Sequence, residues 1–449
     1  MKKVIKINNK NYTIPSFFWI SNLGGGGSDK YRETVYLDLY NGIPTLYNYY
    51  YLKYPSFATK WLSKINNYKT FGDFLKFTRN DMINTEHFIC KNHNPGIYNY
   101  NENIYLLDSG ARNILNDIIR GKIKLHNSIE ETMVEKMYEY YDFANRFKFD
   151  FVIGYDLGGK YTFKDSECSD ERLKQEIERL TNSDMNKLLF DKTIEYLINH
   201  PNYYPKVYAT VHGKTPNDYK NYINYIVQTE KEKKYEFFGY ALGGVASSKS
   251  VDDSWFVGFN NKELKNTYLV TTATKIVKSI GGNKPIHVLG GGNKDNIPTL
   301  IFNGATSFDC QTPGRRSYDG NNNSSLLVYD NNAKVSFSKY IPGLFDNNLN
   351  LINTNYKFDY YKINQISDTN LLCGCPACSL INNTKDLKKL YSMKNQSDEY
   401  YYYARQIMNS HSIWQHCKLT NLVSNFESFD KLIEKYPLEF FKYLNDNIN

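Results

Sequence analysis

The sequence predicts an α/β fold, a (β/α)8 TIM barrel, because strand-like apolar runs alternate with longer amphipathic segments and because those strands are apolar throughout. The strand-like runs occur at 17–21, 104–108, 149–156, 206–212, 235–242, 285–290 and 306–310. Apolar strands separated by helices pair in parallel, since each helical crossover covers one face of the sheet. At least seven such units over roughly 300 residues favour a closed barrel over an open sheet.

The amphipathic segments supply the predicted outer helices. Apolar residues recur at spacings of three and four in 129–147, 170–199, 216–231 and 262–280, which is the period of a helix with one buried face. A last amphipathic segment, 427–445, is predicted to form one helix that closes the outer ring. Between these parts, 320–372 is polar and rich in asparagine, and a hairpin is predicted around KVSFSKY at 334–340.

Three cysteines lie close together after this polar stretch. Cys373, Cys375 and Cys378 form a C-x-C-x-x-C cluster, which supplies three thiolates from one loop, and a tetrahedral structural zinc site needs only one more ligand. His411 and His416 are the two candidates for it. The alternatives are three reduced core thiols or a disulfide, which so short a loop disfavours. We therefore predict structural Zn²⁺ in an inserted C-terminal zinc-binding subdomain, 366–449, that follows a barrel over 1–365.

The composition is typical of an intracellular protein. The chain has 449 residues, with Lys+Arg 55 against Asp+Glu 47 and a net charge of +8, which suits a polyanionic partner although the charge is thinly spread. The other cysteines are scattered, which excludes a secreted disulfide framework. The basic start has no apolar segment behind it, and no stretch approaches the length of a bilayer span. We expect a cytoplasmic protein with no membrane partner.

Carboxylates, a histidine and glycines stand at the predicted carboxyl ends of the strands, where a (β/α)8 barrel carries its chemistry. They are Asp108, Asp156, His212, Gly243-Gly244, Gly290 to Gly292 and Asp309. A single aspartate at a strand end is more often a helix N-cap. Three on different strands favour a site, either a divalent metal centre or a nucleophile and an acid/base at a glycosidic carbon.

Five segments together carry a family resemblance. FDCQTPGRRSYDG (308–320) has an aspartate that opens a segment with a proline, a basic residue and a closing glycine, and it is joined by LLDSGARN (106–113), GYALGGVA (239–246), HVLGGG (287–292) and the cysteine cluster with its later histidine. Taken in their order along the chain, from about residue 100 to 415, they resemble the queuine/archaeosine tRNA-guanine transglycosylase family. Residues 1–100 match it poorly, so the N-terminal part of the barrel is divergent.

The resemblance implies a base exchange in which guanine leaves a polynucleotide and a 7-deazaguanine replaces it. It implies that Asp309 is the nucleophile at C1′ and that Asp108 is the acid/base. Asp156 would bind the N1 and exocyclic amine edge, while His212, where the family usually has glutamine, would face O6. The further implied residues are Ser109, Gly243, Gly244, Val245, Ala246 and Arg315 for the substrate, and Cys373, Cys375, Cys378 and His411 for structural zinc.

One departure from the family bears on the substrate. Tyr318 stands where tRNA-acting bacterial members usually carry a second arginine. This favours the DNA-modifying, DpdA-like branch, with DNA and a 7-deazaguanine base as partners in a bacterial or phage-infected cell. A tRNA enzyme for queuosine or archaeosine precursors and a noncatalytic nucleic-acid-binding partner subunit are the alternatives, and a homodimer stays open.

Overall fold

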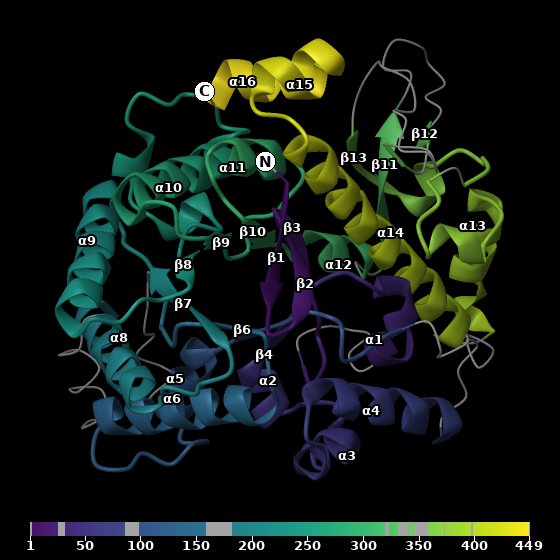
Figure 1. Cartoon of the computed structure of the whole chain (residues 1–449). Helices are drawn as coiled ribbons and strands as arrows, with labels where there is room; N and C mark the ends of the chain where they lie inside the picture. The colour runs from purple at the N-terminus through teal and green to yellow at the C-terminus, as the bar shows by residue number, and fades with distance from the viewer. Residues whose placement is uncertain are drawn as a thin grey trace.

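Eight parallel strands form a closed barrel in the computed structural model, which describes residues 2–25, 32–85, 98–158, 182–318, 323–330, 340–341, 343–344, 358–371, 373–396 and 398–448 (Figure 1). The barrel strands are β3 (Ser16–Ile20), β4 (Thr45–Asn48), β5 (Tyr105–Asp108), β6 (Phe151–Ile153), β7 (Lys206–Val211), β8 (Gly239–Leu242), β9 (Ile286–Val288) and β10 (Ser307–Asp309). Pairing of β10 with β3, with Ser307 opposite Ser16, closes the ring. The predicted (β/α)8 fold is confirmed.

The second barrel strand, β4, is not among the strands predicted from the sequence. Its four residues, TLYN, pair with β3 on one side and β5 on the other. The tyrosines that follow at once begin helix α2 (Tyr49–Lys53), so no apolar run of recognisable length marks the strand.

The helices that surround the barrel begin at local signals. Ser128 caps α6 by accepting from the Glu131 backbone N–H. Thr215 and Asp218 form a reciprocal capping box at α9, with Pro216 in the first turn, and such caps satisfy N–H groups that have no partner within the helix. The helices up to the last barrel strand are α1 (Arg32–Val35), α2, α3 (Thr59–Leu62), α4 (Phe71–Thr85), α5 (Ala111–Ile119), α6 (Ile129–Arg146), α8 (Asn182–Asn199), α9 (Pro216–Lys233), α10 (Lys265–Gly281) and α11 (Asn296–Phe302).

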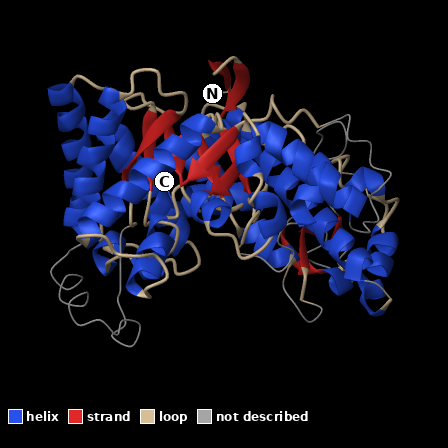
Figure 2. Ribbon diagram, turned by 90° about the horizontal axis from the view of Figure 1, so that it is seen from below, coloured by secondary structure: helices blue, strands red, loops and turns tan. Residues whose placement is uncertain are grey.

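A hairpin covers the amino end of the barrel. Its strands β1 (Lys3–Ile7) and β2 (Lys10–Ile14) are antiparallel, and Figure 2 shows the hairpin projecting from one end of the molecule. The Tyr12 ring enters the barrel, with its centroid 5.1 Å from that of Phe151. Lys10 Nζ lies 2.8 Å from the buried Asp150 carboxylate. This end is therefore filled, and the opposite end is left for chemistry.

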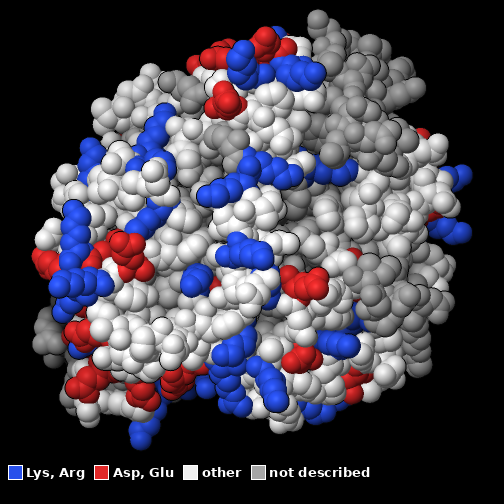
Figure 3. Space-filling view, viewed as in Figure 1, with Lys and Arg blue, Asp and Glu red and all other residues white. Residues whose placement is uncertain are grey.

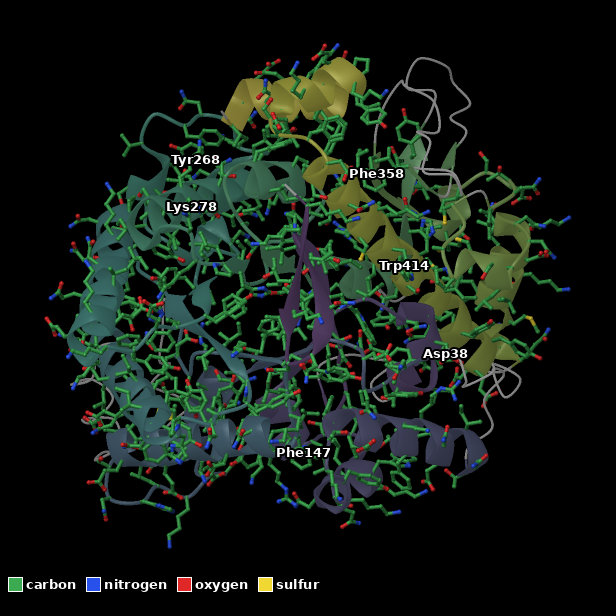
Figure 4. All side chains as sticks on the ribbon, in the orientation of Figure 1. Asp38, Phe147, Tyr268, Lys278, Phe358 and Trp414 are labelled. Atoms are coloured by element: carbon green, nitrogen blue, oxygen red, sulfur yellow. The ribbon has the colours of Figure 1, made fainter. Side chains whose placement is uncertain are left out.

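After β10 the chain leaves the barrel and returns. The helix α12 (Thr312–Ser317) leads to a sheet of β11 (Ser325–Asp330), β12 (Tyr340–Ile341) and β13 (Phe358–Lys362), and then to α13 (Thr384–Ser392) and α14 (Asp398–Ser424). The long helix α14 contacts both β3 and β11, and Trp414, labelled in Figure 4, donates from Nε1 to the Leu39 carbonyl at 2.8 Å. The helix α14 therefore joins the segment that follows β10 to the barrel. The predicted division at residue 365 remains a prediction.

The single helix predicted over 427–445 is wrong. The structure has two helices, α15 (Phe429–Lys435) and α16 (Glu439–Ile448), separated by Pro437, which has no N–H to donate and whose ring clashes with a preceding turn. Phe429, Leu444 and Ile448 pack with Leu264 in a small apolar cluster. The helix beside β3 is α14 instead.

Two further predictions concern parts that the structure does not describe. The hairpin at 334–340 lies outside the described residues except for Tyr340, and so does 170–181 of the helix predicted at 170–199. Within the described ranges, no helix is both long enough and apolar enough to cross a membrane. On the face seen in Figure 3, basic side chains are interspersed with acidic ones, in keeping with a net charge that is thinly spread.

Candidate active site and metal site

Three aspartates and a histidine gather at the carboxyl end of the barrel. Asp108 and Asp309 are the last residues of β5 and β10, His212 directly follows β7, and Asp156 lies three residues beyond β6. The charge of Asp309 acts on Asp108, and that of Asp108 acts on Asp156. The strand-end residues that the sequence predicts therefore share one mouth.

Asp309 is almost completely buried and is held from two sides. Its Oδ1 lies 3.0 Å from His287 Nε2, and its Oδ2 accepts from the Gly290 backbone N–H at 3.0 Å. The other nitrogen of His287 lies 2.9 Å from Ser307 Oγ. His287 is not among the predicted site residues, although its inward position on β9 could have been found from the period of two in a strand. These contacts fix the carboxylate in one orientation.

Asp108 holds its proton more tightly than an ordinary aspartate. Burial, followed by the charge of Asp309, raises its pKa from 3.8 to about 6, against hydrogen bonds from the Ser109 and Gly110 backbones and from Asn48. Asn48 Nδ2 donates to Asp108 Oδ2 at 2.7 Å. Asn48 is the last residue of β4, the strand that is not predicted from the sequence. Asp108 and Asp309 thus have different surroundings.

Asp156 and His212 form the other half of the mouth. Burial, followed by the charge of Asp108, raises the pKa of Asp156 to about 7, although its Oδ2 accepts from the Gly158 backbone N–H at 2.8 Å. Burial lowers the pKa of His212 to about 4, so its ring is neutral. The closest approach of the pair, from His212 Nδ1 to Asp156 Oδ2, is 3.6 Å.

The glycine pair after β8 lies against these side chains. A Cβ on Gly243 would come within 3.1 Å of Thr210 Cγ2 and 3.8 Å of Asp156 Oδ2, and Gly244 has a φ of +75°, which glycine adopts without strain. Val245 is buried in the main apolar core, whereas Ala246 is exposed beside Gly290. The backbone, not a side chain, therefore approaches the mouth at Gly243 and Gly244.

Two predicted substrate residues have structural contacts. Ser109 is buried and its Oγ accepts from the Ala111 backbone N–H at 3.3 Å, at the start of α5. Arg315 is exposed on α12 and donates to Gln311 Oε1 of the preceding turn at 2.9 Å. The structure therefore brings Asp108, Asp156, His212 and Asp309 together, whereas the described contact of Arg315 lies on its own helix.

The cysteine cluster is completed by a histidine from α14. The Sγ atoms of Cys373, Cys375 and Cys378 and the Nδ1 of His411 all lie within 4.8 Å of one another, and all four residues are buried. His411 Nε2 lies 2.9 Å from the Leu327 carbonyl of β11, which orients the ring. Three thiols and one imidazole at such distances fit a tetrahedral metal ion. This is a candidate metal site.

His416, the other candidate for the fourth ligand, lies elsewhere. Its Nδ1 is 2.7 Å from the Ser412 carbonyl of its own helix, and its ring packs against Phe17 with centroids 5.0 Å apart. His411 is therefore the histidine of the cluster.

A barrel whose mouth holds several carboxylates, joined to a cluster of three cysteines and a histidine, defines a class of (β/α)8 proteins with a separate metal site. No family model matches the chain. It is 31% identical over 150 residues to the queuine tRNA-ribosyltransferase of Treponema denticola, over 31% of this chain and 34% of the relative. It is 26% identical over 196 residues to that of Lachnoclostridium phytofermentans, over 44% of this chain and 38% of the relative.

The resemblance to tRNA-guanine transglycosylases is thus confirmed at low identity. The chain spans 34% and 38% of the length of these curated relatives. Both are named for tRNA, and the DNA-acting branch stays a prediction.

Proposed function

We propose that the protein is a base-exchange transglycosylase that replaces guanine in a polynucleotide with a 7-deazaguanine. The observation that carries the proposal is the unequal pair of carboxylates: Asp309 is held between His287 and Gly290, and the pKa of Asp108 is raised to about 6 by burial and by Asp309. Two carboxyl groups whose environments differ in this way suit a nucleophile and an acid/base.

The exchange takes two displacements at C1′. In the first, an oxygen of Asp309 bonds to C1′ while the bond from C1′ to guanine breaks, and the Asp108 carboxyl gives its proton to the departing base. In the second, Asp108 takes a proton from the incoming base, which attacks C1′ and releases Asp309. Two inversions give net retention, and the covalent ester divides one difficult step into two easier ones. The target nucleotide has to leave its stack to reach the mouth.

The base pocket follows from the resemblance and from the contacts around β6, β7 and β8. Asp156 receives the N1 and amine edge, and His212 with the Gly244 amide faces O6. The backbone at Gly243 lies so close to the Thr210 and Asp156 side chains that a side chain at this position would be crowded. By the resemblance Ser109, Val245 and Ala246 belong to the pocket, and Arg315, exposed on the helix after β10, meets the polynucleotide backbone.

Zinc is the proposed metal, in a structural role. The set of three thiols and one imidazole is one that zinc prefers, and four protein ligands leave no open position for catalysis. The site joins the loop at 373–378 to α14 and, through His411 and the Leu327 carbonyl, to β11. A bound ion would therefore hold together the parts of the chain that follow β10.

DNA is the first candidate polynucleotide, on the ground of Tyr318. Its hydroxyl donates to Glu33 Oε1 at 3.0 Å and accepts from Gln406 Nε2 at 2.8 Å, so this position carries an internal hydrogen-bond network instead of a guanidinium group for RNA. The second candidate is tRNA, which the names of both relatives favour.

The test is exchange of radiolabelled guanine into duplex DNA, single-stranded DNA and unmodified tRNA, at matched concentration and moderate salt. We expect incorporation into DNA that weakens as salt rises, because phosphate contacts release counterions. The matched control is Asp309→Asn, which should give none. Incorporation confined to tRNA would overturn the DNA proposal and leave base exchange standing. Binding without any exchange would favour the noncatalytic partner subunit.

A further inference from the structure

The amide of Asn186, on α8, has only one orientation that satisfies its neighbours. Its Oδ1 lies 2.8 Å from the Leu157 backbone N–H, which can only donate. Its Nδ2 lies 3.2 Å from the Gly158 carbonyl, which can only accept. Both contacts agree, so Nδ2 carries the donor hydrogens on the side that faces His212.

This orientation determines which nitrogen of His212 carries the proton. Asn186 Nδ2 lies 3.3 Å from His212 Nδ1, so Nδ1 has to accept and the proton of a neutral ring sits on Nε2. The competing partner of Nδ1 is Asp156 Oδ2, which lies 3.6 Å away, beyond normal hydrogen-bond range. This oxygen also already accepts from the Gly158 backbone N–H. Burial, which lowers the pKa of His212 to about 4, keeps the ring neutral.

The proton on Nε2 has no acceptor among the described residues. His212 is 5% exposed, and its Nε2 is buried with no hydrogen-bond partner in the described part of the chain. The ring is also fixed against the edge of Tyr222, with centroids 4.7 Å apart at 75°. A buried donor without a partner is costly, so the Nε2 hydrogen is left for an acceptor on a bound molecule.

We propose that Asn186 is a positioning residue that holds His212 in the Nε2–H tautomer, so that the ring donates to a 6-oxo group and the site selects 6-oxopurines over 6-aminopurines. The inference rests on the proposed base exchange. An oxygen at position 6 accepts the Nε2 hydrogen, whereas an amino group there would place one donor against another. The preference depends on the tautomer of His212, because in the opposite tautomer Nε2 would be an acceptor and would favour an amino group at position 6.

The test uses Asn186→Asp, which keeps the volume and the contact with Leu157 N but replaces the donor by an acceptor. His212 should then carry its proton on Nδ1. At pH 8.5 the ring stays neutral, because its pKa of about 4 leaves room for the rise of about 1–3 units that one carboxylate causes. The matched control is Tyr222→Phe, which removes the hydrogen bond to the Asn186 backbone carbonyl and leaves the amide untouched.

Two readouts are compared. The first is the ¹⁵N NMR spectrum of the histidine rings, with the His212 signals assigned by their loss in His212→Gln. The second is the ratio of kcat/KM for incorporation of guanine and of 2,6-diaminopurine. These bases differ at position 6 and in the N1 proton, and Asp156, which faces N1, is the same in every variant. The change in the ratio therefore reports on His212.

We expect the Nε2–H tautomer in the wild-type protein and a ratio that falls by about tenfold to hundredfold in Asn186→Asp, the value of one hydrogen bond in a buried site. Tyr222→Phe should leave the ratio unchanged. A wild-type ring protonated on Nδ1, or an unchanged ratio in a folded Asn186→Asp with the proton on Nδ1, would overturn the inference. An Nε2–H ring in a protein that exchanges no base would support the role of Asn186 and refute the proposed function, so the two failures are distinguishable.

Discussion

Asn48→Leu tests how the mouth sets the proton affinity of Asp108. The Asn48 amide donates to Asp108 Oδ2 at 2.7 Å and lowers the pKa of that carboxyl, which burial and Asp309 have already raised to about 6. Leucine has nearly the same shape and no donor. The variant should therefore raise the pKa of Asp108 further.

The magnitude follows from the hydrogen bond. A bond to a charged group contributes about 1.5–3 kcal/mol, so at about 1.4 kcal/mol per pKa unit its loss should raise the pKa by about one unit or more. Because the folded-state pKa lies above the unfolded value of 3.8, ionisation of Asp108 lowers the free energy of unfolding as pH rises through about 6. In the variant this loss continues to a higher pH.

The assay is denaturant unfolding of wild type and variant at pH 5 and pH 8. At pH 5 Asp108 is protonated in both folded proteins and the variant should cost little, whereas at pH 8 it should cost about 1–2 kcal/mol more than at pH 5. The matched control is Thr45→Val at the other end of β4, whose hydroxyl accepts from Asn103, and its cost should not change with pH. A cost of Asn48→Leu that is equal at both pH values would refute this account of Asp108.

Three further predictions concern the nucleophile, its support and the metal. Asp309→Asn should form no covalent adduct with an oligonucleotide on denaturing electrophoresis, while the wild type forms one, because an amide cannot make the glycosyl ester; an adduct in the variant would move the nucleophile elsewhere, first to Asp108. His287→Phe keeps a ring in the barrel but removes the group 3.0 Å from Asp309 Oδ1, so adduct formation should slow by about tenfold to hundredfold, and an unchanged rate in single-turnover kinetics would contradict its role. Cys375→Ser should lose metal and fold poorly, whereas the wild type should hold about one zinc per chain by metal analysis; fully active wild-type protein free of zinc would refute the structural role.

Much of the fold was predictable because most of the barrel strands can be recognised as strand-like runs in the sequence. Seven of the strands correspond to the strand-like runs of the sequence, and the order of these runs and of the helices between them predicts the closed sheet that the structure has. The strand β4 was not predictable, because four residues that run directly into tyrosines of a helix show no period. The break at Pro437 was visible in the sequence as a residue that ends helices.

The chemical groups can be identified from the amino-acid sequence: three aspartates at strand ends and a cluster of three cysteines, whose residue types and spacing are typical of a barrel mouth and of a metal site. Their partners depend on how the chain packs. Asn48, Asn186 and His287 reach the mouth from β4, α8 and β9, and no spacing of residue types in the sequence marks these three polar residues as neighbours of the aspartates. His411 and His416, five positions apart on α14, point about 140° apart around a helix of about 3.6 residues per turn. His411 faces the cysteines and His416 faces Phe17. The way α14 packs therefore determines which histidine belongs to the cysteine cluster.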